Sequence, residues 1–416
     1  MLRRMLRALF RLLPLAAAAS AMAAEPLRLE DALMRVDARG PDQAVTFGQA
    51  EVSRADISTA RMLPNPVFLI GVGRSEPRVN LSLSQRLPIF GQHGAAVAAA
   101  EKGFLQARAE AQASRWRLRH DARVAYYAVL RAEEEVVIAV AVEALTGRIA
   151  EIAAKRLDAG AGTRLEKEQG SLVHVRALQD VSDRKAAARV SRFELFRLLG
   201  AGEAEVGALV DPLDRVGATP PLEELLAAAR DRHPELRALI AERAAALARE
   251  HTARTERRPL PTLEIGAELL DAGTCDPTGA STSRCLGPRG ALSFDLPILS
   301  LNGGPIERAR AEARLAELKL AAAAVRVDAQ VRSAWENFAA ATARAQFFDL
   351  EYVPAATSVE QMAREGFTEG RTGLLPLIEA ERSVLEARVG RAEALFARQS
   401  ARADLEEASG VPLSAP

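Results

Sequence analysis

The fold is decided by residues 93–158, whose sequence is HGAAVAAAEKGFLQARAEAQASRWRLRHDARVAYYAVLRAEEEVVIAVAVEALTGRIAEIAAKRLD. This stretch contains no proline and is rich in Ala, Leu, Glu and Arg, the residue types with the highest helix propensity. A helix of about 65 residues is roughly 100 Å long at 1.5 Å per residue, several times the diameter of a small domain. The sequence therefore predicts a helix that cannot lie inside a compact globule.

A second helix is expected to return beside the first. The segment Gly160-Ala161-Gly162-Thr163 ends the first helix, and a second proline-free run extends from Arg164 to Leu199. Gly160 suits a left-handed helix C-cap, and Thr163 suits the N-cap of the returning helix. The pattern predicts a long helical hairpin with a glycine tip, although a simple coiled-coil spacer would have the same local sequence.

The N-terminus has the pattern of a secretory signal peptide over residues 1–23. Four arginines precede the apolar stretch Leu12–Ala21, and Ala21-Met22-Ala23 fits a signal-peptidase site. No cysteine lies near this site, so no lipid attachment is expected there. We expect an exported chain, with an uncleaved helical N-terminus as the alternative.

Four short segments are expected to be strands, and those after the first alternate between apolar and polar residues. A helix expected over 27–62, interrupted at Gly40-Pro41, is followed by strands at Val67–Val72 and Val79–Ser84. Two more strands are expected at Leu263–Leu269 and Leu292–Leu296. Alternation of this kind fits a half-buried soluble sheet or a membrane β-barrel. Because barrels of this kind start at about 8 strands, several copies of the chain would have to share one barrel.

The same order of landmarks occurs twice along the chain, which indicates an internal duplication. The matching segments are 29–31 and 222–224, 64–66 and 259–261, 87–89 and 296–298, and Gly160 and Gly370. We therefore expect a first repeat over 24–210 and a second repeat over 211–416. Each repeat would contain a helix, two strands and a long helical hairpin.

Composition and motifs argue against nucleic-acid binding and catalysis. The chain has 55 Lys+Arg and 55 Asp+Glu, so it lacks the basic excess typical of nucleic-acid partners. The five histidines are not at metal-ligand spacing, and no phosphate-binding loop or nucleophile elbow is present. We expect no enzyme activity, no metal site and no cofactor. No membrane-spanning helix is expected after the signal segment either.

These landmarks resemble the TolC family of outer-membrane efflux proteins, especially its CzcC-like branch. The segments that carry the resemblance are PNP at 64–66, LSQ at 83–85, LPI at 87–89, GAGT at 160–163 and GRT at 370–372. The resemblance implies a mainly α protein with a small β part. Its duplicated helical hairpins would form a periplasmic α-barrel, and each protomer of a homotrimer would give four strands to a 12-stranded outer-membrane β-barrel.

The resemblance also implies partners and a function. The chain would be the outer-membrane exit duct of a tripartite efflux system. It would dock to a periplasmic adaptor (membrane fusion) protein and an inner-membrane pump of the RND type, and it would contact outer-membrane lipid. The cargo could be heavy-metal cations or small toxic compounds. The alternatives are a periplasmic coiled-coil adaptor or structural protein, and an outer-membrane duct for type I protein secretion.

Two acidic residues near the tips are candidates for a periplasmic gate. In the family pattern two acidic positions follow the second tip glycine, and here Pro376 occupies the first position and Glu379 the second. Glu166 is the equivalent acidic residue of the first tip. Three symmetry-related carboxylates would attract cations and raise one another's pKa. The alternative for Glu379 is a solvated helix position.

The tips and one inter-strand segment supply the remaining candidate residues. Contact with an adaptor is expected at the residues of the two tips, although any helical hairpin needs tip glycines. These candidates are Gly160, Thr163, Arg164, Gly370, Arg371, Thr372 and Leu374. Cys275 and Cys285 lie in the longer connection of the second strand pair, and in an exported chain they favour a disulfide over free thiols or a metal pair.

Overall fold

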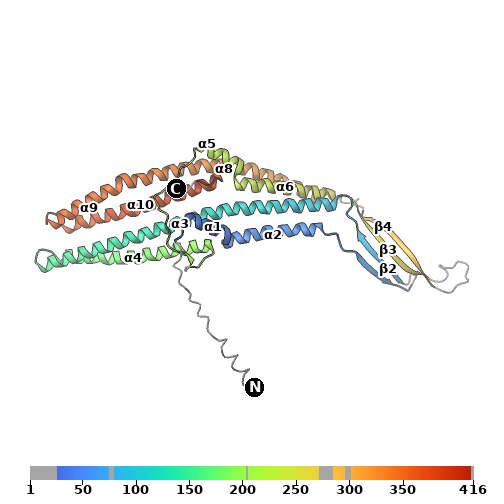
Figure 1. Ribbon diagram of the computed structural model, residues 1–416, viewed down its shortest axis with the longest axis horizontal. Helices are drawn as coiled ribbons and strands as arrows, with labels where there is room; N and C mark the ends of the chain where they lie inside the picture. Colours follow the sequence, from blue (N-terminus) through green and yellow to red (C-terminus); the bar gives the residue numbers. More distant parts are fainter. Residues whose placement is uncertain (1–25, 75–78, 203–204, 271–283, 296–300, 414–416) are drawn as a thin grey trace, which may run out of the picture.

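The computed structural model describes residues 26–74, 79–202, 205–270, 284–295 and 301–413. The expected signal peptide at 1–23 lies outside these ranges. The described chain is an elongated array of long helices with one small sheet at one end (Figure 1). None of the helices described is both long enough and apolar enough to cross a lipid bilayer.

The long helix and its return are confirmed. Helix α3 spans Gln92–Asp158, and α4 spans Arg164–Leu199. Gly160 has φ = 72°, the left-handed conformation that glycine adopts without a steric penalty. Thr163 is the N-cap of α4, so both ends of the first tip follow from the local sequence.

The second half of the chain repeats this design with one irregularity. Helix α8 (Gly303–Phe347) continues through a π-helical turn (Phe348–Tyr352) into α9 (Val353–Thr368), and α10 (Leu374–Ser409) returns. The ring of Phe348 packs on Gly390 of α10, where a Cβ would lie 2.6 Å from a ring carbon. The sequence analysis did not anticipate the π turn.

Shorter helices flank the long ones. Helices α1 (Leu29–Arg39) and α2 (Pro41–Arg61) are separated at Gly40, and α5 (Leu222–Arg232) and α6 (Pro234–Thr255) are separated at His233. In each pair a proline begins the second helix, where its missing N–H costs nothing. The expected interruption at Gly40-Pro41 is confirmed.

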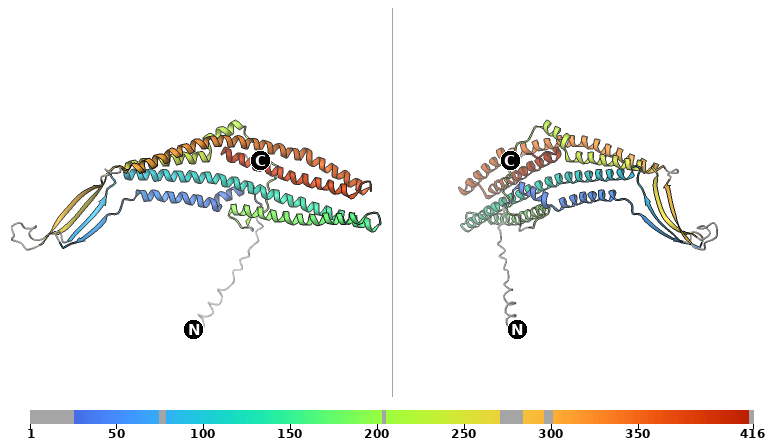
Figure 2. Two further views of the ribbon diagram at one scale, coloured as in Figure 1. Left: turned by 180° about the vertical axis from the view of Figure 1, so that it is seen from behind. Right: turned by 45° about the vertical axis from the view of Figure 1, so that its right-hand side comes forward.

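Helix α3 runs through both ends of the helical array (Figure 2). Toward the sheet, α3 lies between α2 and α6, and α6 lies beside α8. Toward the tips, α3 lies between α4 and α10, and α10 lies beside α9. Both ends are therefore four helices wide, with α2 and α8 as the outer helices at one end and α4 and α9 at the other.

Two apolar clusters lie near the middle of the array, where the short helices meet the long ones. The first packs Tyr126 and Leu195 against Leu33 of α1. The second packs Leu226 of α5 against Val327 of α8. Each cluster fixes a short helix of one half of the chain against the long helices.

The four strands form one antiparallel sheet in the order β1-β2-β3-β4. The strands are β1 (Val67–Val72), β2 (Val79–Arg86), β3 (Leu260–Leu270) and β4 (Cys285–Asp295). Strands β3 and β4 are longer than the sequence analysis expected. Cys285 is therefore the first residue of β4 rather than part of the inter-strand connection, which corrects its expected placement.

The expected alternation is confirmed for β2 and β3. Leu83 pairs with both Phe68 and Ile265, so these side chains share one face of the sheet. Ser82 is 5% exposed and lies on the opposite face, whereas Ile265 is 55% exposed. In the single chain the apolar face is thus the uncovered one, the reverse of the arrangement in a soluble sheet.

Candidate functional site

The first helical tip is closed by a reciprocal pair of hydrogen bonds. The backbone N–H of Thr163 donates to the carboxylate of Glu166 at 2.8 Å, and the N–H of Glu166 donates to the Thr163 hydroxyl at 3.1 Å. This capping box satisfies two N–H groups at the start of α4. The carboxylate of Glu166 therefore stabilises its own helix, and its gating role stays a prediction.

The second tip lacks a side-chain cap. Gly370 has φ = 72°, as Gly160 does, but the N-cap of α10 is Gly373, which has no side chain to accept a hydrogen bond. The backbone N–H groups of Arg371 and Thr372 donate to the carbonyl of Gly366 at 2.8 and 3.1 Å. The Arg371 side chain pairs with Glu369. The second tip is therefore held by backbone hydrogen bonds to the end of α9 and by this ion pair, without a side-chain cap on α10.

The two hairpins pack against each other close to their tips. Ile149 and Ala153 of α3 contact Phe367 of α9 and Leu377 of α10 in one apolar cluster. The guanidinium of Arg156 lies over the Phe367 ring, 5.1 Å from its centroid. Packing of this kind links the positions of the two tips.

Leu374 belongs to the same cluster, which corrects one expected adaptor contact. Its side chain is only 2% exposed, because it packs against the apolar residues of the neighbouring hairpin. Leu374 is a packing residue between the hairpins in this structure. The other tip candidates Thr163, Arg164, Arg371 and Thr372 are exposed.

Glu379 is exposed on α10, two residues after the buried Leu377. Pro376, at the other family position, is exposed as well. The single chain does not bring Glu379 together with copies of itself, so a ring of carboxylates would require further protomers. The gating role of Glu379 stays a prediction.

A buried charge cluster near the second tip was not anticipated. The carboxylates of Glu360 on α9 and Glu381 on α10 are both buried, and both pair with the guanidinium of Arg364, which lies 3.1 Å from Glu381. Burial raises the pKa of Glu381 to about 7; the hydrogen bond from Arg364 opposes this increase, and the neighbouring Glu360 adds to it. The sequence shows the i,i+4 spacing of Glu360 and Arg364. It does not show the contact with Glu381, because that residue lies on another helix and meets them only through tertiary packing.

Glu381 also lines a groove between the two hairpins. The groove has a volume of about 560 Å³ and runs between α3, α4 and α10. Its walls are apolar at Val142, Ile149 and Leu385, and Arg184 also lines it. Both hairpins thus contribute to one elongated depression on the side of the helical array.

The expected disulfide falls partly outside the described chain. Cys275 lies outside the described residues, so the pairing with Cys285 stays a prediction. Across the described ranges, no group of three His, Cys, Asp or Glu side chains is arranged to hold a metal ion.

Comparison with known proteins gives consistent results. Residues 49–201 match the family model described as outer membrane efflux protein. The chain is 24% identical over 370 residues to the cobalt-zinc-cadmium resistance protein CzcC of Cupriavidus metallidurans, covering 88% of this chain and 86% of that protein. Its similarity therefore extends over both halves of the chain.

Solved channel structures share the fold. CusC, described for transmembrane channel formation, has a TM-score of 0.75 and 17% identity, with 94% of each chain covered. The outer-membrane channel OprN has a TM-score of 0.73 and 20% identity, covering 92% of this chain and 90% of that one. The sheet with an uncovered apolar face and the duplicated hairpins agree with these similarities: the chain has the fold of the outer-membrane channels, and its residues 49–201 match the outer membrane efflux protein family.

Proposed function

We propose that three copies of the chain form the exit duct of a tripartite efflux system. The observation that carries this proposal is the four-stranded sheet, which leaves its apolar face uncovered and its outer strands β1 and β4 each with an unpaired side. An open edge and an exposed apolar face are both unfavourable in water. Closure into a barrel in lipid removes both problems.

The strand order permits this closure without rearrangement. Because the four strands alternate in direction, β1 of one copy would run antiparallel to β4 of the next. Three copies would then give a 12-stranded barrel, within the size range of membrane barrels. The apolar residues Leu83, Ile265 and Leu292 would face lipid, and Ser82 and Glu264 would face the lumen.

The long helices would continue the duct into the periplasm. Copies would meet at the outer helices α2 and α8 near the sheet, and at α4 and α9 near the tips. An adaptor protein would contact the exposed tip residues, which are Gly160, Thr163, Arg164, Gly370, Arg371 and Thr372. The inner-membrane pump, of the RND type, would supply the energy. Glu379 would narrow the pore at its periplasmic end and would favour the passage of cations there.

The proposed cargo is heavy-metal cations, and small toxic compounds are the second candidate. The support is the similarity to a protein named for cobalt, zinc and cadmium resistance. Deletion of the gene should raise the cellular content of zinc, cobalt or cadmium when cells are exposed to that metal. Complementation should return the metal content to the wild-type level. Unchanged metal content together with raised accumulation of dyes or antibiotics would favour the second candidate.

Two further measurements separate the proposal from its alternatives. Recovery of the protein in the soluble periplasm alone would favour an adaptor or structural protein over a duct. Loss of a secreted protein in the deletion strain, without a change in metal or drug tolerance, would favour type I secretion. Cross-linking in the outer-membrane fraction should give a trimer.

A further inference from the structure

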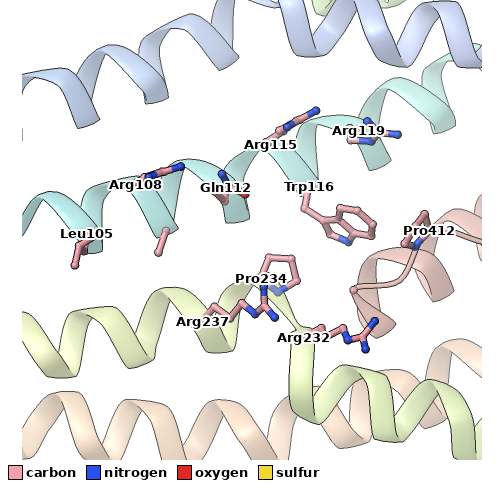
Figure 3. Close-up of a pocket in the computed structure, with 12 residues that line it drawn as sticks. Leu105, Arg108, Gln112, Arg115, Trp116, Arg119, Arg232, Pro234, Arg237 and Pro412 are labelled. Atoms are coloured by element: carbon pink, nitrogen blue, oxygen red, sulfur yellow. The ribbon is translucent and has the colours of Figure 1, made fainter.

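A cleft lined by arginines lies where three distant segments of the chain meet. It has a volume of about 630 Å³ and is bounded by α3, by the turn between α5 and α6, and by the segment that follows α10. Figure 3 shows Trp116 projecting from α3 toward Pro234 and Pro412, with Arg232 and Arg237 on the other side of the space. The cleft therefore joins the two halves of the chain.

The lining carries a strong excess of positive charge. Five arginines line the cleft, and among the described residues that line it there is no Asp or Glu. These arginines are Arg108, Arg115, Arg119, Arg232 and Arg237. The chain as a whole has equal numbers of basic and acidic residues, so this concentration of one sign is a local feature.

The ion pairs around the cleft leave much of this charge unneutralised. Arg115 and Arg119 both bond to the single carboxylate of Asp37, each at 2.6 Å. Burial alone would raise the pKa of Asp37, but the two guanidiniums hold it below its usual range. Arg232 pairs with Asp231 at 3.2 Å. Since one carboxylate serves both Arg115 and Arg119, and Arg108 and Arg237 have no acidic partner among the described residues, a net positive charge remains beside the cleft.

Two further guanidiniums are available to a ligand. Arg108 on α3 and Arg237 on α6 are exposed, and neither has an acidic partner within the described part of the chain. The indole N–H of Trp116, at the centre of the lining, has no hydrogen-bond acceptor either. These donors converge on the cleft from two helices.

We propose that the arginine cleft binds a compact polyvalent oxyanion, such as a polyphosphate or a polycarboxylate. Guanidinium groups match the oxygens of phosphate and carboxylate with paired hydrogen bonds. The volume lies in the range of small-molecule sites, about 300–1,000 Å³. Such an anion would bridge α3 of the first half to α6 of the second and stabilise the middle of the array.

The position of the cleft favours a dissolved anion over a lipid headgroup. The lining residues of α3 are roughly 20–40 Å along the helix from its start beside the sheet, at 1.5 Å per residue. This step rests on the proposed insertion of the sheet in the membrane. Within the proposed trimer, copies meet at α2 and α8, so the seam between α3 and α6 would stay uncovered.

Binding is tested on the purified, detergent-solubilised full-length mature chain, with tripolyphosphate and citrate as probes in separate titrations. We expect wild type to bind at least one probe in low salt and more weakly in 1 M salt, because the Debye length falls to about 3 Å. The double variant Arg108→Gln, Arg237→Gln should bind about a hundredfold more weakly, since each of the two lost charge-assisted hydrogen bonds is worth about tenfold in affinity. The same variant should lose the rise in Tm that the anion produces.

A charge-matched control isolates the site. Arg189 on α4 and Arg314 on α8 are exposed and lie outside the cleft lining, so Arg189→Gln, Arg314→Gln should keep wild-type affinity. Equal loss in both double variants would indicate a diffuse charge effect and overturn the proposal. Absence of binding to either probe by wild type would overturn it as well.

Fluorescence gives an independent measurement if the arginine variant folds poorly. The chain has two tryptophans, so Trp335→Phe leaves Trp116 as the only indole. Tripolyphosphate should then change the Trp116 emission, and an unchanged spectrum at saturating anion would contradict the proposed location. None of these measurements requires a pump, an adaptor or transport, so their failure is distinguishable from failure of the proposed duct.

Discussion

Arg156 of α3 lies over the ring of Phe367 of α9, with 5.1 Å between the guanidinium carbon and the ring centroid. This contact joins the first hairpin to the second close to both tips. Phe367 is also buried among Ile149, Leu374 and Leu377, so the contact is part of a packed cluster. The conformation of one tip is therefore coupled to that of the other through side-chain packing.

Replacing this ring should loosen the tips without affecting the sheet. Phe367→Ala should cost about 3 kcal/mol, near the lower end for removing a buried aromatic ring. Hydrogen exchange should become faster in α9 and at the tip end of α3, while the exchange of β2 and β3 stays unchanged. Leu375, which is 56% exposed on the neighbouring helix, gives a matched control, since Leu375→Ala should change little. Similar exchange in both variants would show that the cluster does not hold the tips together.

The packing of the second hairpin should depend on pH through Glu381. Its pKa is raised to about 7 by burial and by Glu360, above the ordinary value of 4.5. The folded state then binds more protons than the unfolded state between these values. The stabilisation is complete below about pH 4.5 and is lost as the pH rises through 7. After correction for the intrinsic pH dependence of amide exchange, the protection of α9 and α10 should therefore be greater at pH 5.5 than at pH 8.

Glu381→Gln should reduce this pH dependence, because a neutral amide occupies the buried position at every pH. Glu386→Gln, at an exposed position of the same helix that pairs with Arg382 at 2.8 Å, is the control and should keep the wild-type pH dependence. Identical pH profiles in wild type and Glu381→Gln would remove Glu381 as the titrating group.

The two faces of the sheet should respond differently to charge. Ile265→Arg on the uncovered apolar face should hinder insertion into the outer membrane, at a cost of up to about 2–4 kcal/mol near the bilayer midplane. Glu264→Arg, one residue earlier and on the other face, should be tolerated and should alter conductance. Ser82 also lies on the polar face, but Ser82→Arg is a poorer control than Glu264→Arg. Ser82 packs closely opposite Gly266, so a larger side chain there would disturb the sheet itself. Equal insertion of Ile265→Arg and Glu264→Arg would show that the apolar face does not meet lipid.

The charge of Glu379 should influence ion selectivity. Glu379→Gln should lower the cation selectivity of the purified channel in a planar bilayer, with the largest effect at low salt, where charges are least screened. Glu166→Gln should preserve helix α4, because glutamine also completes a capping box. Unchanged selectivity in Glu379→Gln would leave this residue as a solvated helix position.

Cys275 and Cys285 should form a disulfide. Non-reducing peptide mass spectrometry should detect the linked pair, whereas two alkylated thiols would reject it. Because the bridge closes a short loop, its removal should cost about 2–3 kcal/mol at most. The double Cys→Ser variant should therefore still assemble.

Sequence by itself determined the helices, the strand faces and the duplication. Helix α3 could be located because its propensity is uninterrupted over the whole stretch, and Gly160 and Thr163 mark its end and the next start through local backbone requirements. The faces of β2 and β3 follow from strict alternation, since successive side chains of a strand point to opposite sides. These are all features that depend on neighbours within a few residues.

Tertiary structure alone decided which side chains meet across the hairpins. Leu374 looked like an accessible tip residue, but the other hairpin buries it. Glu360 and Glu381 share Arg364 because α9 and α10 pack side by side. Arg108 and Arg237 line one cleft because α3 and α6 pack side by side as well. Helical periodicity gives the face on which a residue lies, whereas its partner depends on the axial offset between two helices, which packing along their whole length determines.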